Sequence, residues 1–308
     1  VPQVWNNGAT GEGIGIAILD TGIYPHPDLT SPVNRIVAFK DFVGKKTTPY
    51  DDNGHGTHCA GDAASNGLKS VGKYSGPAPQ ANLIGVKVLN KMGSGMMSGI
   101  IAGIQWCIDN KDTYNIRVLS MSLGAKATAS YVDDPLCKAV EKAWDAGIAV
   151  CVAAGNEGPE TGTISSPGID PKVITVGAAD DRNTVTSPDD RIAPFSSRGP
   201  TVDGLSKPDL VASGVNIVSL RSPKSYIDKS NKNSRVGEWY NSLSGTSMAT
   251  PVCAGIAALI LSKYPQFSPD NLKSLLVSTC RTMDADVNSQ GAGIVDAWAA
   301  LLQADSEN

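Results

Sequence analysis

Short, almost continuously apolar runs alternate along the chain with segments in which apolar residues recur every three or four positions. Apolar runs of this length, rich in Val and Ile, are typical of parallel strands that are covered on both faces. They predict strands at residues 13–19, 82–89, 118–123, 148–153 and 173–176.

The segments between these runs carry apolar residues at helical spacing, and several begin with residues that suit a helix start. Asp133 or Asp134 lies near the start of one such segment, and Ser268 precedes Pro269, which fits the first helical position of another. The predicted helices run through Met97, Ile101, Ile104 and Ile108, through Leu136, Val140 and Ala143, from about Ser247 to Lys263, and onward from Pro269.

Strands that alternate with helices of this length predict a mostly parallel central β-sheet flanked by helices on both faces. The chain shows no internal repeat and no low-complexity linker, so residues 1–308 are expected to form a single α/β domain. Residues 221–241 are the most linker-like part, with five basic and two acidic side chains. We expect an exposed surface loop there; the alternative is that it borders a substrate cleft.

Composition and charge exclude several classes of protein. Hydrophobic residues make up 41% of the 308 residues, which is too many for a disordered chain. The 26 basic and 30 acidic residues leave a net charge of −4 without a block of like charge, so we expect no nucleic-acid partner. The longest apolar stretch, residues 252–261, is shorter than the ~20 residues that span a bilayer, so we expect no membrane partner.

The cysteines indicate a compartment. They are scattered, they include no CxxC pair, and most stand beside small or apolar residues, as buried free thiols do. Free thiols favour a reducing compartment, so we expect a cytoplasmic protein, with secretion as the alternative. The chain begins with Val1 rather than Met, and we expect that an upstream segment has been removed. The six cysteines are Cys59, Cys107, Cys137, Cys151, Cys253 and Cys280.

Three short motifs carry candidate chemistry. Asp20-Thr21-Gly22 follows a predicted strand, where open α/β sheets place their active sites. Gly54-His55-Gly56-Thr57-His58 leaves little side-chain bulk around His55, and Gly245-Thr246-Ser247-Met248-Ala249 places Ser247 at the start of an apolar helix, where the helix dipole favours negative charge. Each residue alone has an ordinary alternative role, as a turn residue, a structural histidine or a helix cap.

Together, in the order Asp, His, Ser, the three motifs resemble those of the subtilisin-like serine proteases. Two further segments are similar to that family: Ser122-Leu123-Gly124 looks like its substrate-binding strand, and Ala154-Gly155-Asn156 like the segment that carries its oxyanion asparagine. Tyr24-Pro25-His26-Pro27-Asp28, and Asp51-Asp52 before Asn53, look most like the AprX-type intracellular alkaline proteases. The resemblance implies the three-layer subtilisin-like fold, and a peptidase catalytic domain over residues 1–308 that lacks its pro-segment.

The resemblance implies a serine endopeptidase that forms an acyl-enzyme. Ser247 would be the nucleophile, His55 the general base, and Asp20 the group that orients His55; the Asn156 amide would stabilise the oxyanion. It also implies peptide and protein substrates, a cleaved pro-segment as partner, and broad specificity with large apolar residues preferred at P1, the residue whose carbonyl is attacked. The implied substrate-binding residues are Gly93, Ser94, Gly95, Ser122, Leu123, Gly124, Ala153, Ala154 and Gly155, with Ser165 and Ser166 at the floor of the P1 pocket.

No cofactor is expected for the chemistry itself, but structural calcium is common in the family. The resemblance implies that such a site would use an Asp like Asp28 and a loop like residues 66–73, but this loop has two Lys and no carboxylate, a poor match for the hard cation. A weaker site near Gly168, Asp170 and Val173 is left open. His55 and His58 lie three residues apart, but without a third ligand or an HExxH motif they do not indicate a catalytic metal.

Two other functions stay open from the sequence. The chain could be a catalytically inactive subtilisin-like fold used for binding, although the Asp, His, Ser and Asn residues all being present speaks against this. It could also be an acyl transferase that captures the acyl-enzyme with an amine, although no large insertion stands near the motifs.

Overall fold

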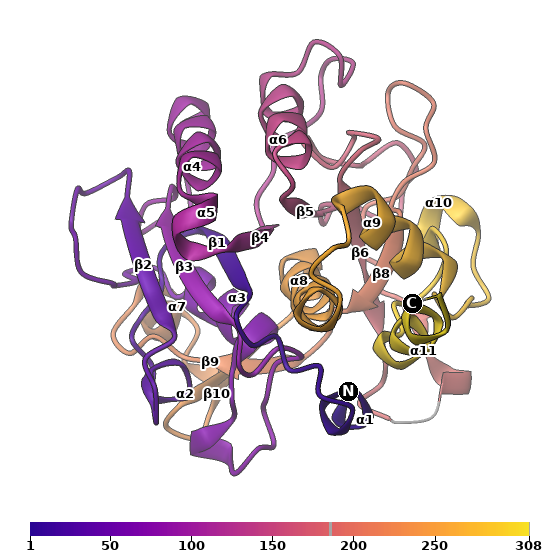
Figure 1. Cartoon of the computed structure of the whole chain (residues 1–308). Helices are drawn as coiled ribbons and strands as arrows, with labels where there is room; N and C mark the ends of the chain where they lie inside the picture. Colours follow the sequence, from indigo (N-terminus) through magenta and orange to yellow (C-terminus); the bar gives the residue numbers. More distant parts are fainter. Residues whose placement is uncertain (185–186, 308) are drawn as a thin grey trace.

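The computed structural model describes residues 1–184 and 187–307. Its main sheet has the strand order β2-β3-β1-β4-β5-β6-β7, with β8 paired to β6 (Figure 1). Among the described residues, the pairings in this sheet are parallel except for β6 with β7. A small antiparallel sheet has the order β10-β11-β9.

The strands of the main sheet and the helices that cover it follow one another along the chain. They are β1 (Gly15–Asp20), β2 (Ile36–Asp41), α3 (His55–Ala64), β3 (Asn82–Lys87), α4 (Met97–Asp109), β4 (Ile116–Met121), α6 (Pro135–Asp145), β5 (Ala149–Ala153), β6 (Ile174–Asp180), β7 (Arg191–Ile192), β8 (Leu210–Ser213), α8 (Thr246–Lys263) and α9 (Pro269–Ser278).

The remaining elements are short, or lie at the ends of the chain. They are α1 (Pro2–Asn6), α2 (Pro27–Thr30), η1 (Leu68–Ser70), α5 (Lys111–Tyr114), η2 (Ser187–Asp189), β9 (Ile217–Leu220), α7 (Tyr226–Ser230), η3 (Lys232–Ser234), β10 (Arg235–Val236), β11 (Tyr240–Leu243), α10 (Val287–Gln290) and α11 (Ala297–Glu307).

Helices cover both faces of the main sheet, as the apolar runs predict. Helices α3 and α8 pack together on one face, and α4 and α6 pack together on the other (Figure 1). All six residues of β1 are buried between these layers, which is why the strand has no polar residue until Asp20. The prediction of a mostly parallel sheet between two helical layers is confirmed.

The predicted strands correspond to β1, β3, β4, β5 and β6, and the predicted helices to α4, α6, α8 and α9. Asp134 caps α6 by accepting hydrogen bonds from the N–H groups of Leu136 and Cys137, and Ser268 forms a capping box at α9. The pattern missed β2 and β7 to β11, because β2 is partly exposed and the others have only two to four residues.

The expectation of an exposed surface loop at residues 221–241 is wrong. This segment contains α7, η3, β10 and the start of β11, and its residues Ser222, Ser225 and Asp228 are buried. Its polar composition suggested a solvated loop, but its polar side chains instead bond to one another and to the backbone. The alternative, that the segment borders a cleft, is the one the structure supports.

Helix α8 is both long and apolar. By length and hydropathy alone it would be able to cross a membrane, but 78% of it is buried inside the protein, as is usual for a core helix. It contacts β4, β5, β6 and β8 as well as α3. Its apolar character is therefore accounted for by the core.

Candidate active site

The Asp and His motifs meet at the carboxyl end of the parallel sheet. Asp20 is the last residue of β1 and is buried, and His55 is the first residue of α3. His55 Nδ1 lies 2.8 Å from Asp20 Oδ1 and 3.0 Å from Oδ2. The ring keeps 24% of its surface exposed, so Nδ1 faces the carboxylate while the ring remains accessible from solvent.

Glycines allow the two motifs to approach. A Cβ on Gly56 would lie 2.2 Å from the Gly22 carbonyl oxygen, so α3 can reach the turn after Asp20 only with glycine there. Gly54, before the helix, has φ +104°, which L side chains rarely adopt. The sequence suggested that the glycines around His55 leave its ring accessible. The structure shows that they are also needed for the backbone to adopt this conformation and for the two turns to approach.

The buried Asp51 carboxylate joins these two turns. It accepts the Thr21 hydroxyl at 2.9 Å on one side and the Thr57 hydroxyl and N–H at 2.6 and 2.9 Å on the other. It also accepts the N–H groups of Asn53 and Gly54 at 3.1 and 2.9 Å. Sequence reasoning noted Asp51 only as part of the resemblance, because its partners are mostly loop N–H groups that leave no pattern in the sequence.

Ser247 is the second residue of α8, and Ser122, just after β4, holds it in place. The Ser122 hydroxyl donates to the Ser247 carbonyl at 2.7 Å, and the Ser247 hydroxyl donates to the Ser122 carbonyl at 3.4 Å. In the described hydrogen bonds Ser247 Oγ thus has the Ser122 carbonyl, and not His55, as its partner. Catalytic hydrogen bonds are often loose without substrate and shorten in the complex.

Asn156 is exposed, and its amide is oriented by the start of α8. Its Oδ1 accepts the N–H of Thr246 at 2.9 Å and the Thr246 hydroxyl at 3.0 Å. Because the oxygen has both of these donors, the amide nitrogen points away from them as a free donor. It lies 3.7 Å from where a Cβ on Gly245 would be, close to the Ser247 turn.

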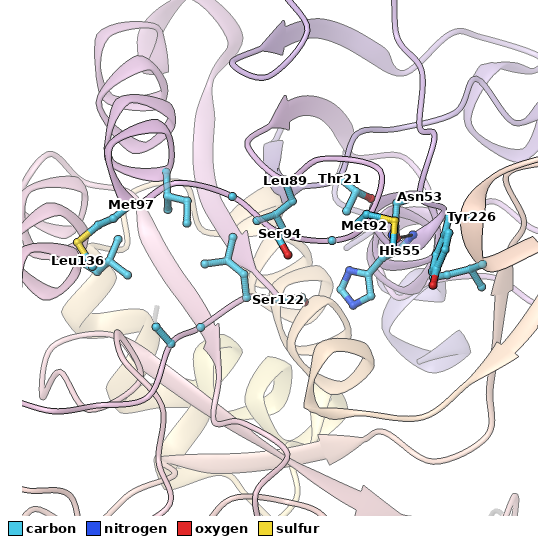
Figure 2. Close-up of a pocket in the computed structure, with 17 residues that line it drawn as sticks. Thr21, Asn53, His55, Leu89, Met92, Ser94, Met97, Ser122, Leu136 and Tyr226 are labelled. Atoms are coloured by element: carbon cyan, nitrogen blue, oxygen red, sulfur yellow. Dashed lines mark hydrogen bonds between the residues drawn. The ribbon is translucent and has the colours of Figure 1, made fainter. Parts of the chain in front are cut away.

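A cleft with a cavity volume of about 630 Å³ opens beside His55. Six of the predicted substrate-binding residues, Gly93 to Gly95 and Ser122 to Gly124, line it. Figure 2 shows the labelled side chains in order along the cleft: Met97 and Leu136 at one end, Leu89, Ser94 and Ser122 between, and His55, Met92 and Tyr226 at the other end.

The remaining predicted subsite residues lie beside this cavity and do not line it. Ala153, Ala154 and Ser166 are buried, whereas Gly155 and Ser165 are partly exposed. Ser165 stands between two glycines: a Cβ on Gly124 would lie 3.1 Å from Ser165 Cβ, and one on Gly155 would lie 2.5 Å from Ser165 Oγ. Ser165 therefore lies between the segments that follow β4 and β5.

The residues near the expected calcium site do not fit a calcium ion. The Val173 carbonyl accepts from the ammonium groups of Lys207 and Lys273, at 3.1 and 2.9 Å. The Gly168 carbonyl accepts the Thr175 hydroxyl at 2.7 Å. Asp170 is buried with one oxygen, Oδ2, unpaired, but a single free oxygen falls far short of the six to eight that calcium takes.

The Asp28 loop is equally closed to a cation. The buried Asp28 carboxylate accepts the Lys69 N–H at 2.9 Å, the Tyr240 hydroxyl at 2.8 Å and the Ser65 hydroxyl at 3.1 Å.

His58, the second histidine of the His55 motif, is buried. One of its ring nitrogens lies 2.9 Å from Asp62 Oδ2 and the other 3.1 Å from the Ile217 carbonyl, so both are used in contacts that support the fold.

Comparison with known proteins supplies the family. The Subtilase family model matches residues 11–293. The chain is a subtilase. It is 60% identical over 304 residues to Serine protease AprX of Bacillus subtilis (strain 168), which is 96% of this chain and 68% of that protein. It is 37% identical over 299 residues to Subtilisin Savinase of Lederbergia lenta, covering 97% and 94% of the two chains. The solved structure of Sphericase matches with a TM-score of 0.75 and 33% identity, covering 93% and 92%.

These similarities confirm the resemblance to subtilisin-like serine proteases and to AprX. As a subtilisin-like serine protease, this subtilase acts on peptide or protein substrates and needs no cofactor for catalysis.

Two titratable groups of the subtilase stand next to each other at the site. Burial disfavours a charged His55 ring, but the Asp20 carboxylate outweighs this cost and raises the pKa of His55 above its ordinary value. Cys59 lies one helical turn after His55, with its Sγ 3.8 Å from His55 Nδ1 and 3.3 Å from the Ser247 carbonyl. Burial raises the pKa of the Cys59 thiol to about 12, so it is a neutral thiol at working pH.

The raised pKa of His55 predicts where activity appears as pH rises. A general base acts only when it is deprotonated, so kcat/KM should increase through the His55 pKa, with the midpoint of the acid limb above ~6.5. Activity should persist at alkaline pH. The check is a pH profile of kcat/KM on an uncharged peptide substrate; a midpoint below 6 would contradict the role of Asp20.

The position of Cys59 predicts selective inhibition by mercurials. Iodoacetamide requires a thiolate and should have little effect, whereas methylmercury, which binds sulfur strongly, should inhibit by displacing the His55 ring. Cys59→Ala should be resistant, and Cys280→Ala, which alters the partly exposed thiol, should stay as sensitive as the unmodified enzyme. Equal sensitivity of Cys59→Ala in residual-activity assays would exclude this mechanism.

Proposed function

We propose that this subtilase is a serine endopeptidase in which Asp20, His55 and Ser247 form the catalytic triad and Asn156 contributes to the oxyanion hole. The observation that carries the proposal is the pairing of His55 Nδ1 with both oxygens of Asp20, at 2.8 and 3.0 Å, on the wall of the cleft. This pairing holds the proton on Nδ1 and leaves Nε2 with the lone pair that a general base needs.

In the proposed reaction, His55 Nε2 takes the proton of the Ser247 hydroxyl as Oγ attacks the substrate carbonyl. The Asp20 carboxylate stabilises the imidazolium that forms, and the proton then passes to the leaving amine. The free amide N–H of Asn156 and the N–H of Ser247, in the first turn of α8 where N–H groups lack helical acceptors, would bind the oxyanion. Water then hydrolyses the acyl-enzyme.

The site also supports a proposal on specificity. Gly124, Gly155 and Ser165 have little side-chain volume, so we propose a P1 pocket that accepts large apolar residues, within broad specificity. By the pattern of the family, a cleaved pro-segment is a further proposed partner of the cleft.

All six cysteines lie in the described residues and are free, five of them buried. This supports the proposal of a reducing compartment, the cytoplasm, over secretion.

Replacing the proposed nucleophile tests the function. Ser247→Ala should lower kcat on a peptide nitroanilide by at least ~10³-fold, because a triad without its nucleophile loses covalent catalysis. Ser262→Ala, at the other end of the same helix, is the matched control and should keep normal activity. Phenylmethylsulfonyl fluoride should add its mass to the peptide that contains Ser247. Full activity of a folded Ser247→Ala variant would refute the proposal.

We propose further that an ammonium takes the place of calcium near Val173. Lys207 is buried, and its Nζ lies 2.6 Å from Asp209 Oδ2, 3.0 Å from Thr175 Oγ1 and 3.1 Å from the Val173 carbonyl. Lys207 is therefore surrounded by oxygens as a bound cation would be. Burial lowers the pKa of Lys207 to about 8, although the negative charge of Asp209 acts to raise it.

This arrangement predicts that chelators do not destabilise the enzyme through this site. Lys207→Met should lower the free energy of unfolding by about 1–3 kcal/mol, because the Val173 carbonyl, the Thr175 hydroxyl and the Asp209 carboxylate lose a buried charged donor, while Asp209 keeps its pair with Lys273. Millimolar calcium should partly restore the stability of this variant alone. Lys263→Met removes the exposed pair with Asp305 and should cost less than ~1 kcal/mol. A calcium-dependent rise in the unfolding temperature of the unmodified enzyme, abolished by Asp170→Asn, would contradict the prediction.

A further inference from the structure

The segment that precedes β11 forms a wall of the cleft next to His55. Tyr226 and Ile227, at the start of α7, line the cleft, and Figure 2 shows Tyr226 beside His55 and Met92. The N–H groups of Tyr226 and Ile227 donate to the carbonyls of Asp52 and Asn53, at 2.8 and 2.9 Å. The wall is therefore attached to the backbone that leads directly into His55.

A buried ion cluster keeps this wall in place. Asp228 is 2% exposed, and its Oδ1 lies 2.6 Å from Arg221 Nε and 2.7 Å from Arg235 Nε. Its Oδ2 accepts the Lys224 N–H at 2.8 Å. These bonds connect the two ends of residues 221–235 across α7. A five-residue helix would not be stable alone, so Asp228 supplies the rigidity that a selective surface needs.

The uncharged side chains of the cleft fall into two groups at its two ends. Met97 and Leu136 lie at one end (Figure 2). Met92 and Tyr226 lie beside His55 at the other end (Figure 2), and Tyr226 and Met92 are 37% and 61% exposed. The segments between the groups, residues 93–95 and 122–124, consist mainly of glycine and serine.

An extended peptide that pairs with these segments would place every second side chain on the same side of its backbone. If P1 enters the space by Gly124 and Ser165, the preceding residue, P2, points the other way. On that side His55 and Tyr226 stand nearest to the scissile bond, and the group around Met97 lies two residues further along.

We propose that Tyr226 and Ile227 determine the specificity for P2 and favour a bulky, uncharged side chain there, and that Asp228 is the residue that positions them. This inference rests on the proposed function, because it places the scissile bond between His55 and Ser247. It assigns a role in substrate recognition to a segment whose composition resembles that of a surface loop.

The test compares peptide nitroanilides that differ only at P2. The unmodified enzyme should prefer Leu over Ala at P2 by about tenfold in kcat/KM, as expected when a few methylene groups enter an apolar site. Tyr226→Ala should reduce this ratio to about threefold or less. Tyr226→Phe should keep it, because the contact is made by the ring and not by the hydroxyl.

Two further variants separate recognition from loss of folding. Tyr226→Asp should raise the preference for Lys over Leu at P2 by about fivefold, a gain that misfolding cannot produce. Met97→Ala is the matched control at the other end of the cleft and should leave the P2 ratio unchanged while lowering the preference for Leu two residues further along, at P4.

Asp228→Asn tests the positioning role. It keeps the shape of the side chain but removes the charge that holds both arginines, so the P2 ratio should fall towards that of Tyr226→Ala. The P4 ratio should be unchanged, which a general loss of structure would not allow.

The outcomes distinguish this inference from the proposed function. A P2 ratio near one in the unmodified enzyme, a ratio unchanged by Tyr226→Ala, or an equal fall in Met97→Ala would overturn the role of Tyr226 while the enzyme remains an active serine protease. Failure of phenylmethylsulfonyl fluoride to label Ser247, or full activity of Ser247→Ala, would overturn the proposed function instead.

Discussion

The buried Asp51 carboxylate is the interaction on which the candidate site depends. Asp20 and His55 come from different elements, the end of a strand and the start of a helix, so their pairing requires that the two turns be held together. Asp51 accepts five hydrogen bonds, from Thr21 after the strand and from Asn53, Gly54 and Thr57 around the start of the helix. A buried carboxylate needs all of these donors, since an unpaired buried charge is costly, and this requirement holds the two turns together.

The same requirement explains two lysines in the interior. Lys87, at the end of β3, donates to the carbonyls of Thr21 and Leu89 and to Asp52, so it too supports the turn after Asp20. Lys207 has a comparable set of oxygen partners far from the cleft. In both places a long, flexible side chain brings a charged donor to backbone oxygens in the interior of the protein.

The sequence predicted the layers of the fold and the residues that meet at the carboxyl ends of the strands, because burial and strand direction leave a clear pattern. It failed where contacts are made by backbone groups. Asp51 binds loop N–H groups, and Tyr226 is held to the Asp52 carbonyl by its own N–H, so neither carries a recognisable spacing. Lys207 is a lysine in a polar stretch, and only the structure shows that it is buried.

The location of Ser247 on α8 has a consequence for how the enzyme would lose activity. Helix α8 runs through the core, so its amides should exchange with solvent only when the whole molecule unfolds. The wall around Tyr226 is held mainly by the Asp228 ion cluster and a few backbone contacts at the surface, so we expect it to open locally at a smaller free-energy cost than α8. Heat or denaturant should therefore relax the selection of substrates before the nucleophile is displaced, so that an enzyme near its unfolding midpoint becomes less discriminating before it becomes inactive.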